Sequence, residues 1–181
     1  MSRLFLLGTP SFAALAACLT SFMLTTSGCS SLSDGPRDLV GKPAPDPRLL
    51  MIDGPEITIS SERGRFLGVL FWATWCNYSK DAIADFEELA RKYARRSDVT
   101  FVAVSIDRYE DFGVLKDRIS SQELHSLKHA FSGGDVQDEA YQMMRGELIP
   151  YAVLIDPRGV VRYVGTSISD IEGILDERFG N

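Results

Sequence analysis

Apolar runs alternate with segments of helical apolar spacing along most of this chain. Residues 66–72 and 99–107 are nearly continuous apolar runs, a pattern typical of strands that are covered on both faces of a sheet. The segment after the first run places apolar residues on one face of a helix: Ile83, Phe86, Leu89 and Tyr93. The pattern therefore predicts a strand, a helix and a second buried strand, in that order.

The remainder of the chain continues this alternation. It predicts a hairpin (49–52 with 57–59), a helix around 112–119, a short strand at 127–131, a helix at 136–144, a second hairpin (151–155 with 160–164) and a closing helix that starts at a capping box, 169–172. Alternating strands and helices that end in an antiparallel hairpin indicate an α/β domain, with a central mixed β-sheet flanked by helices.

The N-terminal segment has a different composition. Residues 1–24 contain one basic residue, Arg3, no acidic residue and an interrupted apolar stretch, which is typical of an export signal rather than a permanent membrane span. Residues 30–47 are rich in Ser, Gly and Pro and have no apolar period, as in a tether. We therefore expect an export signal of the lipoprotein type at 1–28, a tether at 29–47 and a folded domain at 48–181.

The end of the signal contains a cysteine in a motif-like setting. Residues 26–31 (Thr-Ser-Gly-Cys-Ser-Ser) resemble a bacterial lipobox, in which Cys29 is lipidated and becomes the first residue of the mature protein. Cys18 has a better lipobox sequence before it, but its processing leaves an apolar stub at 19–24. Cleavage without lipid and an uncleaved anchor remain alternatives. Every version exports the domain to the periplasm or cell exterior and, when lipidated, attaches it to a bacterial membrane.

Charge and cysteine content reduce the number of functions that this chain can have. Asp and Glu number 25 against 19 Lys and Arg, a net charge of −6 that argues against nucleic acid as a partner. With Cys18 in the signal and Cys29 on lipid, Cys76 is the one free thiol expected in the folded domain. In an oxidising compartment such a thiol either is buried and inert or reacts with a molecule outside the chain.

Cys76 lies at the junction of the strand at 66–72 and the following helix. A helix N-terminus carries partial positive charge and unpaired backbone N–H groups, which stabilise a thiolate. Cys76 is therefore a candidate nucleophile at neutral pH.

Three motifs then point to a family. Residues 72–76 (Trp-Ala-Thr-Trp-Cys) resemble the active-site signature of the thioredoxin superfamily, in particular its membrane-tethered TlpA/ResA-like branch, which is related to the AhpC/TSA proteins. Residues 40–46 and 149–159 resemble the opening segment and the cis-proline loop of that branch. The resemblance implies a thioredoxin-like fold without cofactor or metal and a cis bond before Pro150. It also implies a substrate-binding surface formed by these residues: Trp75, Ile149, Pro150 and Tyr151.

The sequence departs from that branch at positions next to the active-site cysteine. The family has Pro, Cys, Glu and often Pro where this chain has Tyr78, Ser79, Ala82 and Ala84. In a two-cysteine enzyme the second thiol resolves the mixed disulfide, a step that serine cannot perform. We therefore expect a monothiol oxidoreductase: Cys76 exchanges disulfides, the Ser79 hydroxyl assists it, and an external thiol reductant resolves the product. The expected substrates are exported protein disulfides or small thiols.

The main alternative is a redox-inactive module that binds extended peptides of exported proteins. A peroxidase is a weaker alternative, because peroxiredoxins place a threonine three residues before their cysteine and a proline earlier in the same loop. Here Thr74 is two residues before Cys76, and position 69 is Val.

Four other residues have ordinary interpretations. His125 and His129 have the spacing of a metal pair, but we interpret them as surface residues at a strand edge and expect no metal site. Asp107 and Lys80 are interpreted as a solvated strand end and a solvated helix residue.

Overall fold

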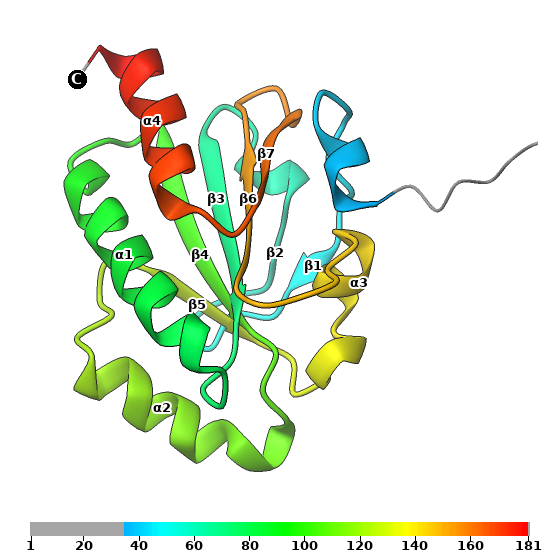
Figure 1. Cartoon of the computed structure of the whole chain (residues 1–181), viewed down its shortest axis with the longest axis vertical. Helices are drawn as coiled ribbons and strands as arrows, with labels where there is room; N and C mark the ends of the chain where they lie inside the picture. Colours follow the sequence, from blue (N-terminus) through cyan, green and yellow to red (C-terminus); the bar gives the residue numbers. More distant parts are fainter. Residues whose placement is uncertain (1–34, 181) are drawn as a thin grey trace, which may run out of the picture. The chain divides into compact units, whose positions relative to one another are not determined.

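The computed structural model describes residues 35–180 (Figure 1). The predicted export signal at 1–28, which contains Cys18, and the following Cys29 lie outside the described residues. No helix among residues 35–180 is both long and apolar enough to cross a membrane.

A mixed five-stranded sheet forms the centre of the domain, in the order β5-β4-β3-β6-β7 (Figure 1). Its strands are β3 (Phe66–Trp72), β4 (Val99–Ser105), β5 (Lys128–Phe131), β6 (Tyr151–Ile155) and β7 (Val161–Gly165). The first three run parallel, whereas β6 pairs antiparallel with both β3 and β7. Every residue of β3 and β4 is buried, as their continuous apolar runs predict.

Helices cover both faces of this sheet. They are α1 (Asn77–Tyr93), α2 (Phe112–Ser121), α3 (Glu139–Met143) and α4 (Ile168–Phe179). Side chains of α1, α2 and α4 pack in one apolar cluster, and side chains of α3 pack in the cluster on the other face. The predicted α/β architecture, a central mixed sheet flanked by helices, is therefore confirmed.

Short elements complete the domain. They are the two-residue strands β1 (Arg48–Leu49) and β2 (Ile57–Thr58), which form the predicted first hairpin, and the 3-10 helices η1 (Pro36–Leu39), η2 (Ser60–Glu62), η3 (Tyr109–Asp111) and η4 (Asp135–Gln137).

Part of the predicted tether belongs to the folded domain. Leu39 is buried in the core, and the backbone of Gly41 and Lys42 exchanges hydrogen bonds with Val161 at the start of β7. The Ala44 N–H donates to the carbonyl of Gly159. The segment from Pro36 to Ala44 is therefore held against the β6–β7 hairpin, and the ordered domain begins before residue 48.

Two helix starts differ from the sequence prediction. The helix expected at 136–144 is divided into η4 and α3, because the Asp138 side chain accepts the N–H of Tyr141 and starts a new helix. The closing helix α4 is capped by Ser167, whose Oγ accepts the N–H of Asp170, and not by the predicted Ser169.

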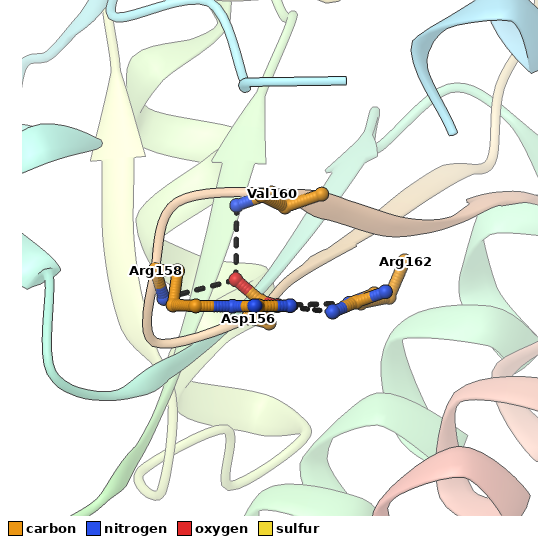
Figure 2. A network of polar contacts seen from close by, with 4 residues as sticks. All are labelled: Asp156, Arg158, Val160 and Arg162. Atoms are coloured by element: carbon orange, nitrogen blue, oxygen red, sulfur yellow. Dashed lines mark hydrogen bonds and ion pairs between the residues drawn. The ribbon is translucent and has the colours of Figure 1, made fainter. Parts of the chain in front are cut away.

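Asp156 organises the turn between β6 and β7 (Figure 2). Its Oδ1 accepts the N–H groups of Arg158 and Val160 at 2.9 and 3.0 Å, and its Oδ2 accepts Nε and Nη2 of Arg162 at 2.9 and 2.6 Å. Burial alone raises the pKa of Asp156, but these hydrogen bonds outweigh it and hold the pKa below its ordinary value. The turn is therefore fixed by an ionised, fully partnered carboxylate.

Candidate functional site

Cys76 is the N-cap residue of α1 and directly follows the loop that leaves β3. Its backbone is extended (φ −88°, ψ 117°), its carbonyl accepts the N–H of Ser79, and its side chain makes no capping hydrogen bond. The side chain is partly buried and is a free thiol. The sulfur thus lies at the N-terminal end of a 17-residue helix, the end that carries the positive pole of the helix dipole.

The cis-proline loop lies against this sulfur. The Ile149–Pro150 peptide bond is cis, as predicted from the family resemblance. Cys76 Sγ lies 3.7 Å from the carbonyl oxygen of Ile149, to which the thiol donates, and both side chains pack on the same apolar cluster. The structure therefore brings together Cys76, Ile149 and Pro150, although 73 positions separate the first two in the chain.

The side chain of Tyr151 belongs to the core. It is buried at the start of β6, and its hydroxyl donates to the carbonyl of Met144 at 2.8 Å. Burial raises the pKa of this phenol well above its usual range. The phenol thus fixes the loop that carries Pro150, and the surface beside Cys76 is formed by other side chains.

Ser79 lies one helical turn after Cys76 and is fully buried. Its hydroxyl has no hydrogen-bond partner within the part of the chain that the structure describes. A buried hydroxyl without a partner loses its hydration and gains nothing in return. Position 79 therefore places a small polar side chain in an apolar environment one helical turn from Cys76.

Exposed apolar side chains surround the cysteine. Trp75, which precedes it, is 57% exposed, and Tyr78 in the first turn of α1 is 80% exposed. Leu148, before the cis bond, is 52% exposed. Large apolar side chains that stay in water next to a site are typical of a surface that contacts another molecule.

Asp107 corrects the sequence interpretation, because it is completely buried and not solvated. Its carboxylate accepts the N–H of Thr74 at 3.1 Å, the Thr74 hydroxyl at 2.7 Å and the Ser105 hydroxyl at 2.7 Å. Asp107 therefore holds the loop that leads from β3 to Cys76. Since the Thr74 hydroxyl donates to this carboxylate, it is already committed to a structural contact.

The register of β3 and β4 explains the position of Asp107. Strands β3 and β4 are parallel, and Trp72 pairs with Ser105, so the residues two places further along each strand lie side by side. Asp107, two places after the end of β4, therefore lies beside Thr74 in the loop that follows β3. Lys80, by contrast, donates to Asn77 on the helix surface, in agreement with its interpretation.

The two histidines do not converge on Cys76. His129 lies on β5, partly buried, with Nε2 2.8 Å from the carbonyl oxygen of Leu124, and burial lowers its pKa. His125 is exposed. Within residues 35–180 no three His, Cys, Asp or Glu side chains gather in a way that could hold a metal ion.

A groove of about 890 Å³ begins beside the cis-proline loop and runs between α1 and α4. Leu148, Ile149 and Pro150 line one end, next to Tyr78. Cys76 does not line the groove itself, but its Ile149 contact places it at this end. A molecule that reaches the sulfur can therefore extend along the groove.

A family model described as the AhpC/TSA family matches residues 40–164. The chain is also similar to "Thioredoxin-like protein YneN" of Bacillus subtilis (strain 168). The two are 25% identical over 143 residues, which cover 76% of this chain and 69% of that protein.

Solved structures resemble the domain. A thiol-disulfide oxidoreductase from Bacteroides fragilis NCTC 9343 superposes with a TM-score of 0.68 at 23% identity, over 75% of this chain and 98% of that one. A thiol:disulfide interchange protein of the thioredoxin family from Chlorobium tepidum TLS gives 0.60 at 25% identity, over 75% and 94%. The chain has a thioredoxin-like α/β fold.

Proposed function

The chain belongs to the AhpC/TSA family, and from this premise we propose that it is a monothiol thiol-disulfide oxidoreductase that acts through Cys76. The observation that carries the proposal is the position of this partly exposed thiol, at the N-terminus of α1 and 3.7 Å from the carbonyl of Ile149. The similar proteins named as thiol-disulfide oxidoreductases support the same reaction type.

The reaction has two exchange steps. The Cys76 thiolate attacks one sulfur of a substrate disulfide, a new S–S bond forms, and the other substrate sulfur leaves as a thiolate that takes up a proton. The substrate is thereby half reduced and held as a mixed disulfide. An external thiol then attacks this bond, becomes disulfide-linked to the substrate and releases Cys76.

Ser79 explains why the thiol that resolves the mixed disulfide must belong to another molecule. Its hydroxyl stands one turn after Cys76, the place of the resolving cysteine in the two-cysteine proteins that the sequence resembles. An alcohol neither resolves a disulfide nor forms one. We propose that Ser79 keeps the mixed disulfide long-lived, so that resolution depends on the external reductant.

We propose further that the protein works outside the cytoplasm, attached to a membrane through a lipid on Cys29. The apolar N-terminal segment and the lipobox-like motif support this location. The exposed side chains of Trp75, Tyr78 and Leu148 favour exported proteins over small thiols as substrates.

One observation favours a second function, a peptide-binding module without redox chemistry. The Cys76 thiol donates its hydrogen to the Ile149 carbonyl, a contact that is lost on ionisation. The exposed apolar surface and the groove serve peptide binding whether or not the thiol reacts.

A trapping experiment separates the two. The full chain, with Cys18 and Cys29 replaced by serine and solubilised in non-ionic detergent, is incubated with glutathione disulfide at pH 7 and analysed by mass spectrometry. We expect a stable adduct of one glutathione on Cys76, which a Cys76→Ser variant cannot form. A matched Ser79→Cys variant should release the glutathione and form an internal disulfide. If the adduct forms only after the protein is unfolded, the oxidoreductase proposal is contradicted and the peptide-binding module is the function that remains.

A further inference from the structure

The groove beside Cys76 carries a row of carboxylates. Asp81, Asp85 and Glu88 all line it and are all exposed. They are four and three residues apart on α1, which places them on one face of the helix. Like charges at this spacing oppose one another and do not stabilise the helix. Helix stability therefore does not explain the row.

These carboxylates have no basic partner. Among residues 35–180 no ion pair is made by Asp81, Asp85 or Glu88. Lys92, the one basic side chain among the described residues that line the groove, is occupied by Glu172 and Asp176 of α4 at 2.7 Å each. The negative charge of the groove thus stays uncompensated along α1.

The row has a defined position relative to the sulfur. With a rise of about 1.5 Å per residue, Asp81 lies about 7 Å and Glu88 about 18 Å from Cys76 along the helix. An extended peptide advances about 3.3 Å per residue. Side chains about two to five residues from a cysteine that reacts with Cys76 therefore fall beside the row.

The other lining side chains suit a polypeptide. Leu89 and Ile168 contribute apolar surface from α1 and α4, and Pro150 lies at the end nearest the sulfur. An elongated groove of about 890 Å³ with apolar and acidic walls matches an extended segment with basic side chains.

We propose that the groove selects substrates in which basic residues lie about two to five positions from the reacting cysteine, in an extended segment of an exported protein. This inference rests on the proposed exchange reaction of Cys76. Charges of one sign in a cleft raise the local concentration and the association rate of an oppositely charged ligand, by 10-fold or more at low ionic strength.

The test uses model peptides that carry one cysteine activated as its mixed disulfide with thionitrobenzoate. Arginines occupy positions two to five from the cysteine on both sides in one peptide, and glutamates or glutamines replace them in two others. The full chain with Cys18→Ser and Cys29→Ser attacks the peptide sulfur, and the coloured thionitrobenzoate thiolate leaves. Its absorbance gives the rate at low salt and in 0.5 M NaCl, on the order of a 4 Å screening length.

Two triple variants with equal loss of charge locate the effect. Asp81→Asn, Asp85→Asn and Glu88→Gln neutralise the row. Asp53→Asn, Asp117→Asn and Glu177→Gln neutralise exposed acids outside the groove. The second variant controls for attraction by the net charge of the whole chain, which is −6.

We expect the arginine peptide to react about 10-fold or more faster than the glutamate peptide at low salt, and high salt to remove most of that ratio. The groove variant should reduce the ratio to about 2-fold, and the control variant should keep it. A ratio below about 2-fold in the unsubstituted groove, or an equal fall in both variants, would overturn the inference while leaving the exchange reaction intact. Absence of reaction with all three peptides would overturn the proposed function instead.

Discussion

The two ends of strand β6 differ in how their polar groups are satisfied. At its C-terminal end Asp156 accepts hydrogen bonds from Arg158, Val160 and Arg162 (Figure 2). At its N-terminal end, near Cys76, the buried Ser79 hydroxyl has no partner in the described part of the chain.

The neighbouring surfaces differ in the same way. The Cys76 end exposes Trp75 and Tyr78, and within residues 35–180 the groove carboxylates of Asp81, Asp85 and Glu88 make no ion pair. Groups at the Asp156 end act on one another and stabilise the fold, whereas the exposed side chains at the Cys76 end remain available to another molecule. Unsatisfied and exposed groups at one end thus indicate where a substrate is to be sought.

Asp107 is the exception that refines this comparison. It lies at the Cys76 end, yet its carboxylate is as fully partnered as that of Asp156. Its partners belong to the loop before Cys76, so its role is to position the cysteine. The site therefore combines a rigid support with an unsatisfied surface.

The largest effect is expected from Cys76→Ser. Without a sulfur the chain forms no mixed disulfide, so exchange should fall more than about 100-fold, to the uncatalysed level. The free energy of unfolding should change by less than about 1 kcal/mol, because the side chain is only partly buried. Thionitrobenzoate release and urea unfolding measure the two quantities. Residual exchange in this variant would show that the reactive group lies elsewhere.

Removal of Asp156 should act on stability alone. Asp156→Ala leaves the N–H groups of Arg158 and Val160 and the Arg162 guanidinium without their buried acceptor, and we expect the free energy of unfolding to fall by about 3 kcal/mol at pH 7. Exchange by the folded variant should stay within about twofold of the parent, since the turn lies at the far end of β6 from Cys76. A large loss of exchange in the folded variant would contradict the separation of the two ends.

The pH dependence of this loss has a definite sign. The folded pKa of Asp156 is lowered, so its stabilisation is fully present above the unfolded value of about 3.9 and is lost as the pH falls through the folded pKa. The difference in unfolding free energy between the parent and Asp156→Ala should therefore be constant near neutral pH and shrink in acid. Urea unfolding at several pH values measures this difference. A difference that grows below pH ~4 would contradict a lowered pKa of Asp156 in the folded protein.

Asp107→Asn should affect both stability and exchange. The amide of asparagine presents N–H groups to the hydroxyl donors of Thr74 or Ser105, which then lack an acceptor. We expect the free energy of unfolding to fall by about 2 kcal/mol. The loosened loop should slow exchange about fivefold in the folded protein, in line with the sensitivity of rates to small misplacements. Asp156→Asn is the matched control and should not slow it. Equal exchange rates in Asp107→Asn and Asp156→Asn would contradict a role of Asp107 in positioning Cys76.

The smallest effect is a gain in stability from Ser79→Ala. The substitution removes a buried hydroxyl that lacks a partner and improves helix propensity, and we expect about 1 kcal/mol of stabilisation. Chemical denaturation measures it. A destabilisation of that size would mean that the hydroxyl has a partner of its own, such as an ordered water.

Local patterns predict the local elements well. The apolar runs of β3 and β4 and the spacing of Ile83, Phe86 and Leu89 correspond to buried strands and to the buried face of α1. The cis bond at Pro150 was predicted only through the family resemblance, because a single X–Pro sequence does not specify its isomer.

Features that depend on contacts between distant segments were missed. The segment around Leu39 resembles a tether by composition, and only its pairing with Val161 makes it part of the domain. Asp107 appears solvated until the register of β3 and β4 places it beside Thr74. The choice of Ser167 over Ser169 as a helix cap depends on the local backbone path, which the capping pattern does not determine.

The most direct test of the central claim is the rate at which iodoacetamide alkylates Cys76 at pH 7, in the native full chain and in the same chain unfolded in urea. Mass spectrometry of residues 66–80, which contain no other cysteine, isolates this thiol. A thiolate stabilised by the N-terminus of α1 predicts faster labelling in the native protein than in the unfolded chain. Labelling that occurs only after unfolding would contradict a working nucleophile and leave a peptide-binding module on a thioredoxin-like fold.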